Sequence, residues 1–298
     1  MKMGLKEWVR NLYQQHYTYE EQVKFLEKCG IVILDRPKAL HQLKHVGLGT
    51  LMPYLCYFWY YDENGKYFNR VSWDSIYQLY QFNDNLRVLL LQATGKVETS
   101  LLELLAYHLE QHYGAYWHLR DDLFKHSSSE NVCEGIQDFM QMHRKYKYYT
   151  FREIKEGMSL GLIYRIYSHF ENHQIKETIA REMGMPPVIA FSSSIYALMK
   201  LRNSCAHPQR IWNKKSCVVP DEFYYAPHPY IWLNNSLNVD RRRIYYLFCL
   251  LNYFMQVIDP DFIFAAKLCQ LLEQNKEVIS FYEMGFPDNW REDPMWRV

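Results

Sequence analysis

The sequence predicts an all-α protein, a helical bundle with a long loop insertion and additional C-terminal helices. Apolar residues recur every three to four positions along almost the whole chain, which is typical of helices that bury one face. Capping residues mark where several of these segments begin, and glycine or proline stands near where they end. A chain patterned in this way buries its apolar faces by packing helix on helix.

The first half of the chain contains four such segments. A capping box, Thr-x-x-Glu at residues 18–21, opens a helix that Gly30 can close. An Asp-Arg-Pro start opens a second helix over 35–46. We expect a short helix near 73–82 and the longest one over 84–112. The inner face of this longest helix is predicted to carry Leu86, Leu89, Leu90, Ala93, Val97, Leu101, Leu104, Leu105 and Leu109.

The second half of the chain continues the helical pattern around one interruption. Between Pro208 and Asn238 prolines and aromatic residues accumulate, which indicates a long ordered loop or small hairpin of the kind that carries function. The aromatic tail from Val278 is expected to pack back on the bundle. Further helices are expected near residues 132–147, 151–172, 173–183, 187–206, 240–257 and 259–274.

Length and composition limit the function classes. The 298 residues are 49% hydrophobic with a formal net charge of +1 at pH 7, which is typical of a folded protein and not of a basic nucleic-acid coat. No apolar run reaches about 18 residues and the N-terminus lacks a signal-peptide core, so we expect no membrane span and a cytoplasmic location. The seven cysteines are scattered without C-x-x-C pairing, so we expect no metal site and no cofactor.

The most informative stretch is Leu201–Asn213, because it places Arg202, Asn203 and His207 within reach of one phosphodiester. An arginine stabilises charge that develops on a phosphate, and an imidazole moves a proton near neutral pH. Together these two groups suffice for RNA cleavage without a metal. Arg202 and His207 are therefore candidate catalytic residues, and Asn203 is a candidate for orienting the substrate or His207. A surface ion pair or a helix-end histidine is the structural alternative.

Spacing alone does not decide between these interpretations. Arginine and histidine with four to six residues between them occur four times in the chain. Arg36 precedes a helix-starting proline, Arg120 precedes two aspartates that would neutralise it, and Arg10 lies in a segment without a long apolar frame. Arg202 instead ends a long apolar-patterned helix. Because the residue before a proline avoids the α region, His207 is expected to leave that helix and swing towards Arg202.

Two further residues near the motif have structural interpretations. Cys205 is better explained as a small helix-packing residue than as a nucleophile, because the sequence signals no partner base. Glu98 stands among apolar positions, where an unpaired carboxylate is costly, so we expect it to meet an arginine or lysine in a structural ion pair.

Basic and aromatic residues around the motif are candidates for binding RNA. The positive charges nearest to it in sequence belong to Lys200, Arg210, Lys214 and Lys215, which can contact an RNA backbone. In the loop, Tyr224, Tyr225 and Trp232 are the aromatic residues to test for base stacking.

The motif resembles the HEPN ribonuclease motif of abortive-infection (Abi) proteins of the AbiD/AbiF type. It reads Arg202-Asn203-x-x-x-His207 with a trailing Arg210-Ile211-Trp212-Asn213, and Pro208-Gln209 departs from the polar residues that related sequences often carry. Other segments resemble that family in order and spacing. They are Ile76-x-x-Leu79-Tyr80-x-Phe82-x-x-x-Leu86-Arg87, Val97-Glu98, Tyr113-Gly114 with Trp117, Glu156-x-x-Ser159-x-Gly161 and Met284-Gly285-Phe286-Pro287-x-x-Trp290.

The resemblance implies a domain plan and an activity. It implies a HEPN-like core at 71–212 ending in the motif, an N-terminal helical segment at 1–70, and the loop with C-terminal helices at 213–298. It further implies a phage-defence toxin that cuts RNA to 2′,3′-cyclic phosphate and 5′-OH ends in a composite homodimer site, with a small non-coding RNA as partner. DNA lacks the 2′-OH and is not an expected partner.

Two alternatives remain within the resemblance. In the first, the chain keeps the HEPN shape only as a non-catalytic RNA-binding scaffold, which binds RNA and leaves it intact. A HEPN toxin can also be silenced by nucleotide transfer to a tyrosine two residues after the histidine, and here that position is Gln209, which counts against this form of control.

Overall fold

The computed structural model describes residues 17–58, 71–125, 132–145, 148–221 and 239–296. Within these residues the regular structure is α-helix and 3₁₀ turn, with two isolated β-bridges and no β-strand. The predicted all-α fold class is therefore confirmed. None of the helices in these ranges is both long enough and apolar enough to cross a membrane.

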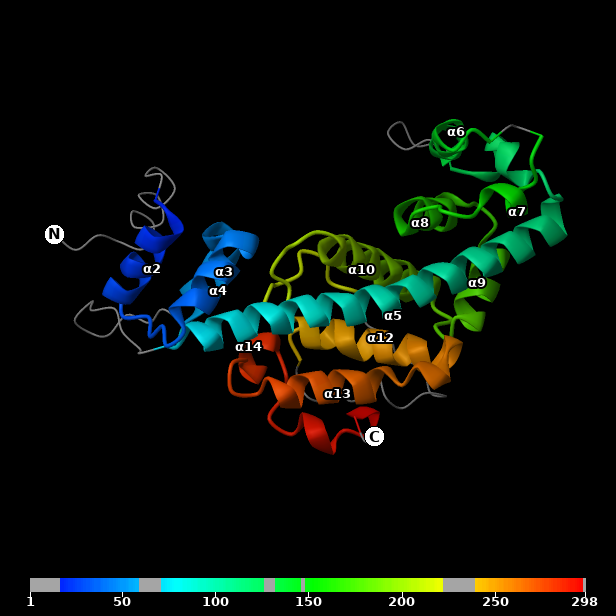
Figure 1. Cartoon of the computed structure of the whole chain (residues 1–298). Coiled ribbons are helices and arrows are strands. Elements are labelled where there is room, and N and C mark those ends of the chain that lie inside the picture. The colour runs from blue at the N-terminus through cyan, green and yellow to red at the C-terminus, as the bar shows by residue number, and fades with distance from the viewer. Residues whose placement is uncertain (1–16, 59–70, 126–131, 146–147, 222–238, 297–298) are drawn as a thin grey trace. The chain divides into compact units, whose positions relative to one another are not determined.

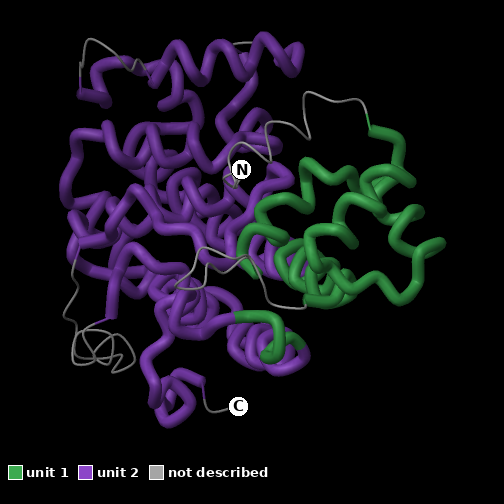
Figure 2. Tube along the Cα trace, turned by 90° about the vertical axis from the view of Figure 1, so that its left-hand side faces the viewer, with its two compact units in different colours: residues 1–84, 275–279 green, residues 85–274, 280–298 purple. Residues whose placement is uncertain are grey.

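The chain divides into two compact units, shown in green and purple in Figure 2. The smaller unit comprises residues 1–84 and 275–279, and the larger unit comprises residues 85–274 and 280–298. The boundaries expected from the family resemblance, at residues 70/71 and 212/213, stay predictions.

The described residues of the smaller unit form three short helices and the beginning of a long one (Figure 1). The predicted capping box is confirmed, because the backbone N–H of Glu21 donates to the Thr18 hydroxyl at 3.3 Å and the Thr18 N–H donates to the Glu21 carboxylate at 2.7 Å. The ring N–H of buried Trp73 donates to the Gln42 side chain at 2.6 Å. The helices are α2 (Tyr19–Lys28), α3 (Arg36–Val46), α4 (Leu48–Tyr57) and the start of α5 (Trp73–Tyr113).

Helix α5 corrects the prediction of separate helices at 73–82 and 84–112. It is continuous over 41 residues. Leu79, Phe82, Leu86 and Leu90 are all buried, so the apolar stripe passes through the polar stretch at 83–85 without losing its helical register. Three polar residues in a row therefore did not end the helix.

The larger unit is organised around α12 (Ile244–Ile258). Every residue from Ile244 to Met255 is buried, so the helix has no solvent face over this length, and its last turn, with exposed Gln256, reaches solvent. It packs against α10 and α13 (Figure 1). Besides the rest of α5, the other α-helices among the described residues of this unit are α6 (Val132–Met142), α7 (Phe151–Ile154), α8 (Leu160–His169), α9 (His173–Glu182), α10 (Val188–Ala206), α13 (Phe264–Gln274) and α14 (Phe281–Met284).

Two predicted helices of the larger unit are interrupted. The helix expected over 151–172 is divided into α7 and α8 by a turn in which Gly157 has a φ of +86°, and the Ser159 side chain caps the new helix. The helix expected over 259–274 begins as a 3₁₀ turn and becomes α13 only after Ile263, which has a φ of +46°. A positive φ at either residue is incompatible with a continuous helix.

The aromatic tail packs back as predicted. Phe286 and Trp290 are each 5% exposed, and their rings lie edge to face with centroids 4.9 Å apart. Gly285 allows this turn, because it has a φ of +89° and a Cβ there would lie 2.3 Å from the Cβ of Arg243. The Met-Gly-Phe-Pro stretch that carries part of the family resemblance therefore has a structural role.

The loop predicted between Pro208 and Asn238 is described only in part. Residues 208–221 contain no helix or strand. Residues 222–238, which include Tyr224, Tyr225 and Trp232, lie outside the described residues, so their expected role in base stacking stays a prediction.

His118 is buried in a polar-poor environment. It is 1% exposed, its ring lies 5.9 Å from that of Phe151, and neither ring nitrogen has a hydrogen-bond partner among the residues that the structure describes. Burial lowers the pKa of His118 from 6.5 to about 4. The folded protein therefore holds this imidazole neutral at physiological pH.

We expect His118 to make the fold sensitive to mild acid. Between the unfolded pKa of 6.5 and the folded pKa of about 4, the unfolded chain binds more protons, so stability falls as the pH falls through this window. The loss of unfolding free energy should approach about 3 kcal/mol. Urea unfolding of His118→Leu at several pH values should show a smaller loss, whereas exposed His41→Leu should behave like the unaltered protein. Equal acid sensitivity in both variants would contradict the assignment.

Candidate functional site

The candidate motif lies at the C-terminal end of α10. The helix ends at Ala206, and His207 has an extended backbone with φ −104° and ψ 152°, so the expected departure from the helix before Pro208 is confirmed. The side chain of His207 is exposed. The backbone N–H of Gln209 donates to the carbonyl oxygen of His207 at 2.7 Å, which closes a tight turn directly after the helix.

This turn is held on both sides. The Arg87 Nε donates to the carbonyl oxygen of Cys205 at 2.9 Å, so a cation satisfies one of the last carbonyls of α10. After the turn, Ile211 and Trp212 are almost fully buried. Only residues 206–210 lie between these two anchored points. The sequence did not indicate this role of Arg87 at the end of α10.

Cys205 has the packing role expected from the sequence. The side chain is fully buried, and burial raises the pKa of its thiol to about 12. A thiol with such a pKa is almost entirely protonated at neutral pH and is a poor nucleophile.

Arg202 pairs with Glu98 of α5, as predicted for this glutamate. The Arg202 Nε lies 3.6 Å from the Glu98 Oε2, and their side chains are 33% and 16% exposed. The Glu98 carboxylate also accepts a hydrogen bond from the backbone N–H of Leu160, the first residue of α8. Glu98 therefore connects the guanidinium on α10 to the positive end of a neighbouring helix.

Burial and pairing act on Glu98 in opposite directions. Burial raises the pKa of its carboxyl group, while Arg202 and the Leu160 N–H lower it, and the net shift is upward. The ionised form is thus tolerated mainly because Arg202 is present. The ion pair also restrains the Nε of Arg202, whose side chain is one-third exposed.

Arg202 opens on a cavity of about 510 Å³. Its wall is formed by α5, the turn between α7 and α8, and α10. The lining is of mixed charge, and Lys155 is paired with Glu103. Its charged residues are Glu98, Glu103, Lys155, Glu156 and Arg202.

Three of the four candidate RNA-binding residues come together at another site, beside α10. Lys200, Lys214 and Lys215 line one cavity of about 150 Å³, and all three are exposed. Arg210 is half-buried and Asn203 is exposed. The three lysines therefore line one cavity, and Arg202 lies with Glu98 at a different one.

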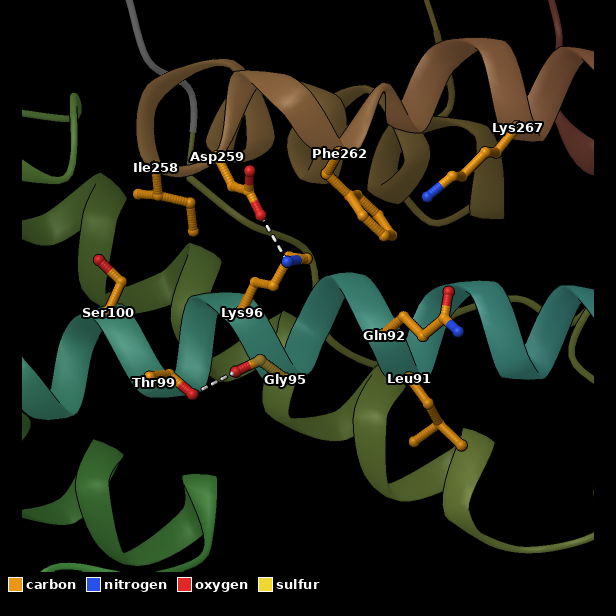
Figure 3. A pocket seen from close by; sticks show the side chains of 10 residues that line it. All are labelled: Leu91, Gln92, Gly95, Lys96, Thr99, Ser100, Ile258, Asp259, Phe262 and Lys267. Atoms are coloured by element: carbon orange, nitrogen blue, oxygen red, sulfur yellow. Dashed lines mark hydrogen bonds and ion pairs between the residues drawn. The ribbon is translucent and has the colours of Figure 1, made fainter.

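A larger cavity of about 830 Å³ lies between α5 and residues 258–267 (Figure 3). Figure 3 shows Lys96 and Asp259 pointing towards one another across it, and they form an ion pair. Lys267 lies over the Phe262 ring, with its Nζ 3.9 Å from the ring centroid. Both cations of this cavity thus have partners within the protein. Among the described residues, no three His, Cys, Asp or Glu side chains converge as they would around a metal ion.

Comparison with known families identifies the class of protein. The model of the Abi-like protein family matches residues 41–213, which end at the last residue of the candidate motif. Because the match covers more than half of the chain, the chain belongs to the Abi-like protein family. This membership indicates a role in abortive infection and antiviral defence. Neither the curated proteins nor the solved structures contain a match to the chain.

The Glu98–Arg202 pair leads to a prediction about stability. Arg202→Ala should lower the unfolding free energy at pH 7 by about 1–2 kcal/mol, because a largely buried carboxylate loses its cation. The penalty should shrink as the pH falls, since burial already favours the protonated carboxyl and nothing replaces the guanidinium. Adding Glu98→Gln should recover most of the loss in urea unfolding. Unchanged stability of Arg202→Ala at pH 7 would show that Glu98 does not depend on this arginine.

Proposed function

We propose that the protein is a metal-independent HEPN endoribonuclease that acts as an abortive-infection toxin. Arg202 and His207 are its catalytic residues, and Asn203 orients the substrate or His207. Lys200, Arg210, Lys214 and Lys215 bind the RNA backbone, and a small non-coding RNA is a partner. The observation that carries the proposal is the end of α10, where a restrained arginine and an exposed histidine are separated by about one helix turn and a tight turn follows the histidine.

The chemistry follows from these two side chains. His207 acts as general base on a ribose 2′-OH, or as general acid towards the leaving 5′-oxygen. Arg202 stabilises the charge of the phosphorane-like transition state. The 2′-oxygen forms a bond to phosphorus while the bond to the 5′-oxygen breaks, which yields a 2′,3′-cyclic phosphate and a 5′-OH. Glu98 is a positioning residue in this scheme, because it contacts Arg202 and not the substrate.

Two chains are needed to complete the proposed reaction. Cleavage uses a base and an acid, whereas each chain offers one His207 in this context. A two-fold dimer with the ends of both α10 helices at the interface supplies two histidines and two arginines. Such an interface must be extensive, because a shared site has to be held to within about half an ångström.

A second function remains open because of the cavity beside Arg202. Three carboxyl groups line it against two basic side chains, so the motif itself is not surrounded by free positive charge. A HEPN-shaped scaffold that binds RNA through the lysines and does not cut it accounts for this arrangement. Copurified RNA that stays intact on prolonged incubation would favour the scaffold.

Cleavage assays with purified protein test the catalytic assignment. His207→Ala and Arg202→Ala should each lower the rate of RNA cleavage by about 100-fold or more, since each removes a proton-transfer group or a charge stabiliser. EDTA should leave the rate unchanged, because the proposed steps use only these side chains. The products should carry 2′,3′-cyclic phosphate ends, and DNA of the same sequence should stay intact.

Matched substitutions outside the motif control for general effects. Exposed Arg181→Ala and His173→Ala on α9 remove the same side-chain types and should leave cleavage unchanged. Circular dichroism and urea unfolding separate lost chemistry from lost folding. Full activity of both motif variants would remove the site assignment.

Subunit mixing tests the composite site. If both chains contribute to one site, a mixture of Arg202→Ala and His207→Ala subunits should recover part of the lost cleavage, because a heterodimer holds one His207 and one Arg202 in the shared site, whereas each homodimer lacks one of the two groups entirely. Each variant alone, refolded or exchanged under the same conditions, is the control. A monomer by light scattering that still cuts RNA would exclude the shared site.

A further inference from the structure

The cavity of about 150 Å³ beside α10 combines positive charge with an apolar floor. Three segments form it: α10, residues 211–217 directly after it and, further along the chain, the first turn of α12. It lies away from the Glu98–Arg202 pair. Arg202 is two residues from Lys200, which corresponds to about 200° around an ideal helix, so the two side chains leave opposite sides of α10.

In the described part of the chain, two lysines of this cavity contact uncharged partners. Lys200 lies over the Tyr196 ring, with its Nζ 5.1 Å from the centroid, and Lys214 Nζ donates to the Gln209 side-chain oxygen at 3.3 Å. Both partners are uncharged. Among the described residues that line the cavity, none is acidic. Three ammonium groups brought together without a carboxylate favour a ligand with more than one negative charge, such as a nucleic-acid backbone.

The floor of the cavity is aliphatic and narrow. Leu201, Ile211, Ile244 and Leu247 line it, and each is less than 9% exposed. A cavity of about this volume between aliphatic side chains accommodates one six-membered aromatic ring. A fused two-ring base would have to displace packed side chains, which costs binding. The half-buried Ser204 at the wall has a hydroxyl that can hydrogen-bond to the polar edge of a base.

We propose that this cavity binds one pyrimidine nucleotide of the RNA substrate. The base lies on the aliphatic floor, and Lys200, Lys214 and Lys215 contact its own phosphate and the adjacent phosphates. The inference rests on the proposed function in taking RNA as the ligand. The residues of α10 that line the cavity lie about 3–9 Å along the helix axis from its end at Ala206, so the bound nucleotide sets which neighbouring phosphodiester reaches His207. The protein thereby gains a sequence preference outside the cleavage motif.

Binding measurements on uncut RNA test the cavity separately from catalysis. In the full chain carrying His207→Ala, fluorescence anisotropy compares labelled oligouridylate with oligoadenylate of equal length. The triple variant Lys200→Gln, Lys214→Gln, Lys215→Gln is compared with a control triple of the same charge change. The control replaces Lys24, Lys28 and Lys44, which are exposed on α2 and α3.

The cavity triple should bind oligouridylate about 100-fold more weakly than the control triple at roughly 0.1 M salt. The slope of log affinity against log salt should fall in magnitude by about 2, the value for three lost contacts to a single strand. The parent should prefer oligouridylate over oligoadenylate by about fivefold or more, because the larger base overfills the floor.

Cys217 supplies a second readout at the cavity itself. It lines the cavity and is the only exposed cysteine of the seven. Oligouridylate should therefore slow alkylation of Cys217 in the parent and not in the cavity triple, as measured by mass spectrometry.

The possible outcomes separate this inference from the proposed function. Equal affinity of the two triples, or equal affinity for the two oligonucleotides, overturns the pyrimidine cavity. Unaltered protein that still cuts RNA in that case leaves the ribonuclease proposal standing. No RNA binding by the His207→Ala protein together with no cleavage by the unaltered protein overturns both.

Discussion

The larger unit depends on the burial of α12 from Ile244 to Met255. A helix that is apolar on every side is stable only when other elements cover all of its faces. Its contacts with α10 and α13 follow from this requirement, as does the return of the aromatic tail, where Trp296 donates to the Tyr245 hydroxyl at 3.1 Å. The position of the motif helix is thus decided by apolar packing, and the polar residues at its end are carried there by that packing.

Electrostatics then determine how the end of α10 is presented. The helix ends in carbonyl groups that attract cations, and Arg87 occupies one of them at Cys205. Arg202 is drawn in another direction by Glu98, whose burial would be unfavourable without it. Arg87 therefore binds a backbone carbonyl, and Arg202 pairs with a carboxylate while its side chain stays one-third exposed. Neither of these two arginine contacts restrains the side chain of His207.

Local signals predicted much of the fold, and the misses have physical causes. The capping box at Thr18 and the buried face of α10 were evident because they depend on residues within one or two turns. Gly157 was missed as a break because the apolar spacing on both sides of it continues across the turn. For the site, the apolar positions around Glu98 predicted that it pairs with an arginine or lysine, but they did not predict that this residue is Arg202. The lysine cavity could not be predicted, because its floor comes from Ile244 and Leu247, far along the chain.

The two anchored ends of residues 206–210 have a thermodynamic consequence for His207. A segment of five residues fixed at Cys205 and Ile211 has few backbone conformations, so little entropy remains to be lost when a substrate arrives. The His207 imidazole can reorient by rotation of its side chain, whereas the backbone that carries it is already ordered. The backbone of His207 is thus ordered during folding. The burial of Trp212 and the hydrogen bond from Arg87 offset the loss of backbone entropy before any RNA is present.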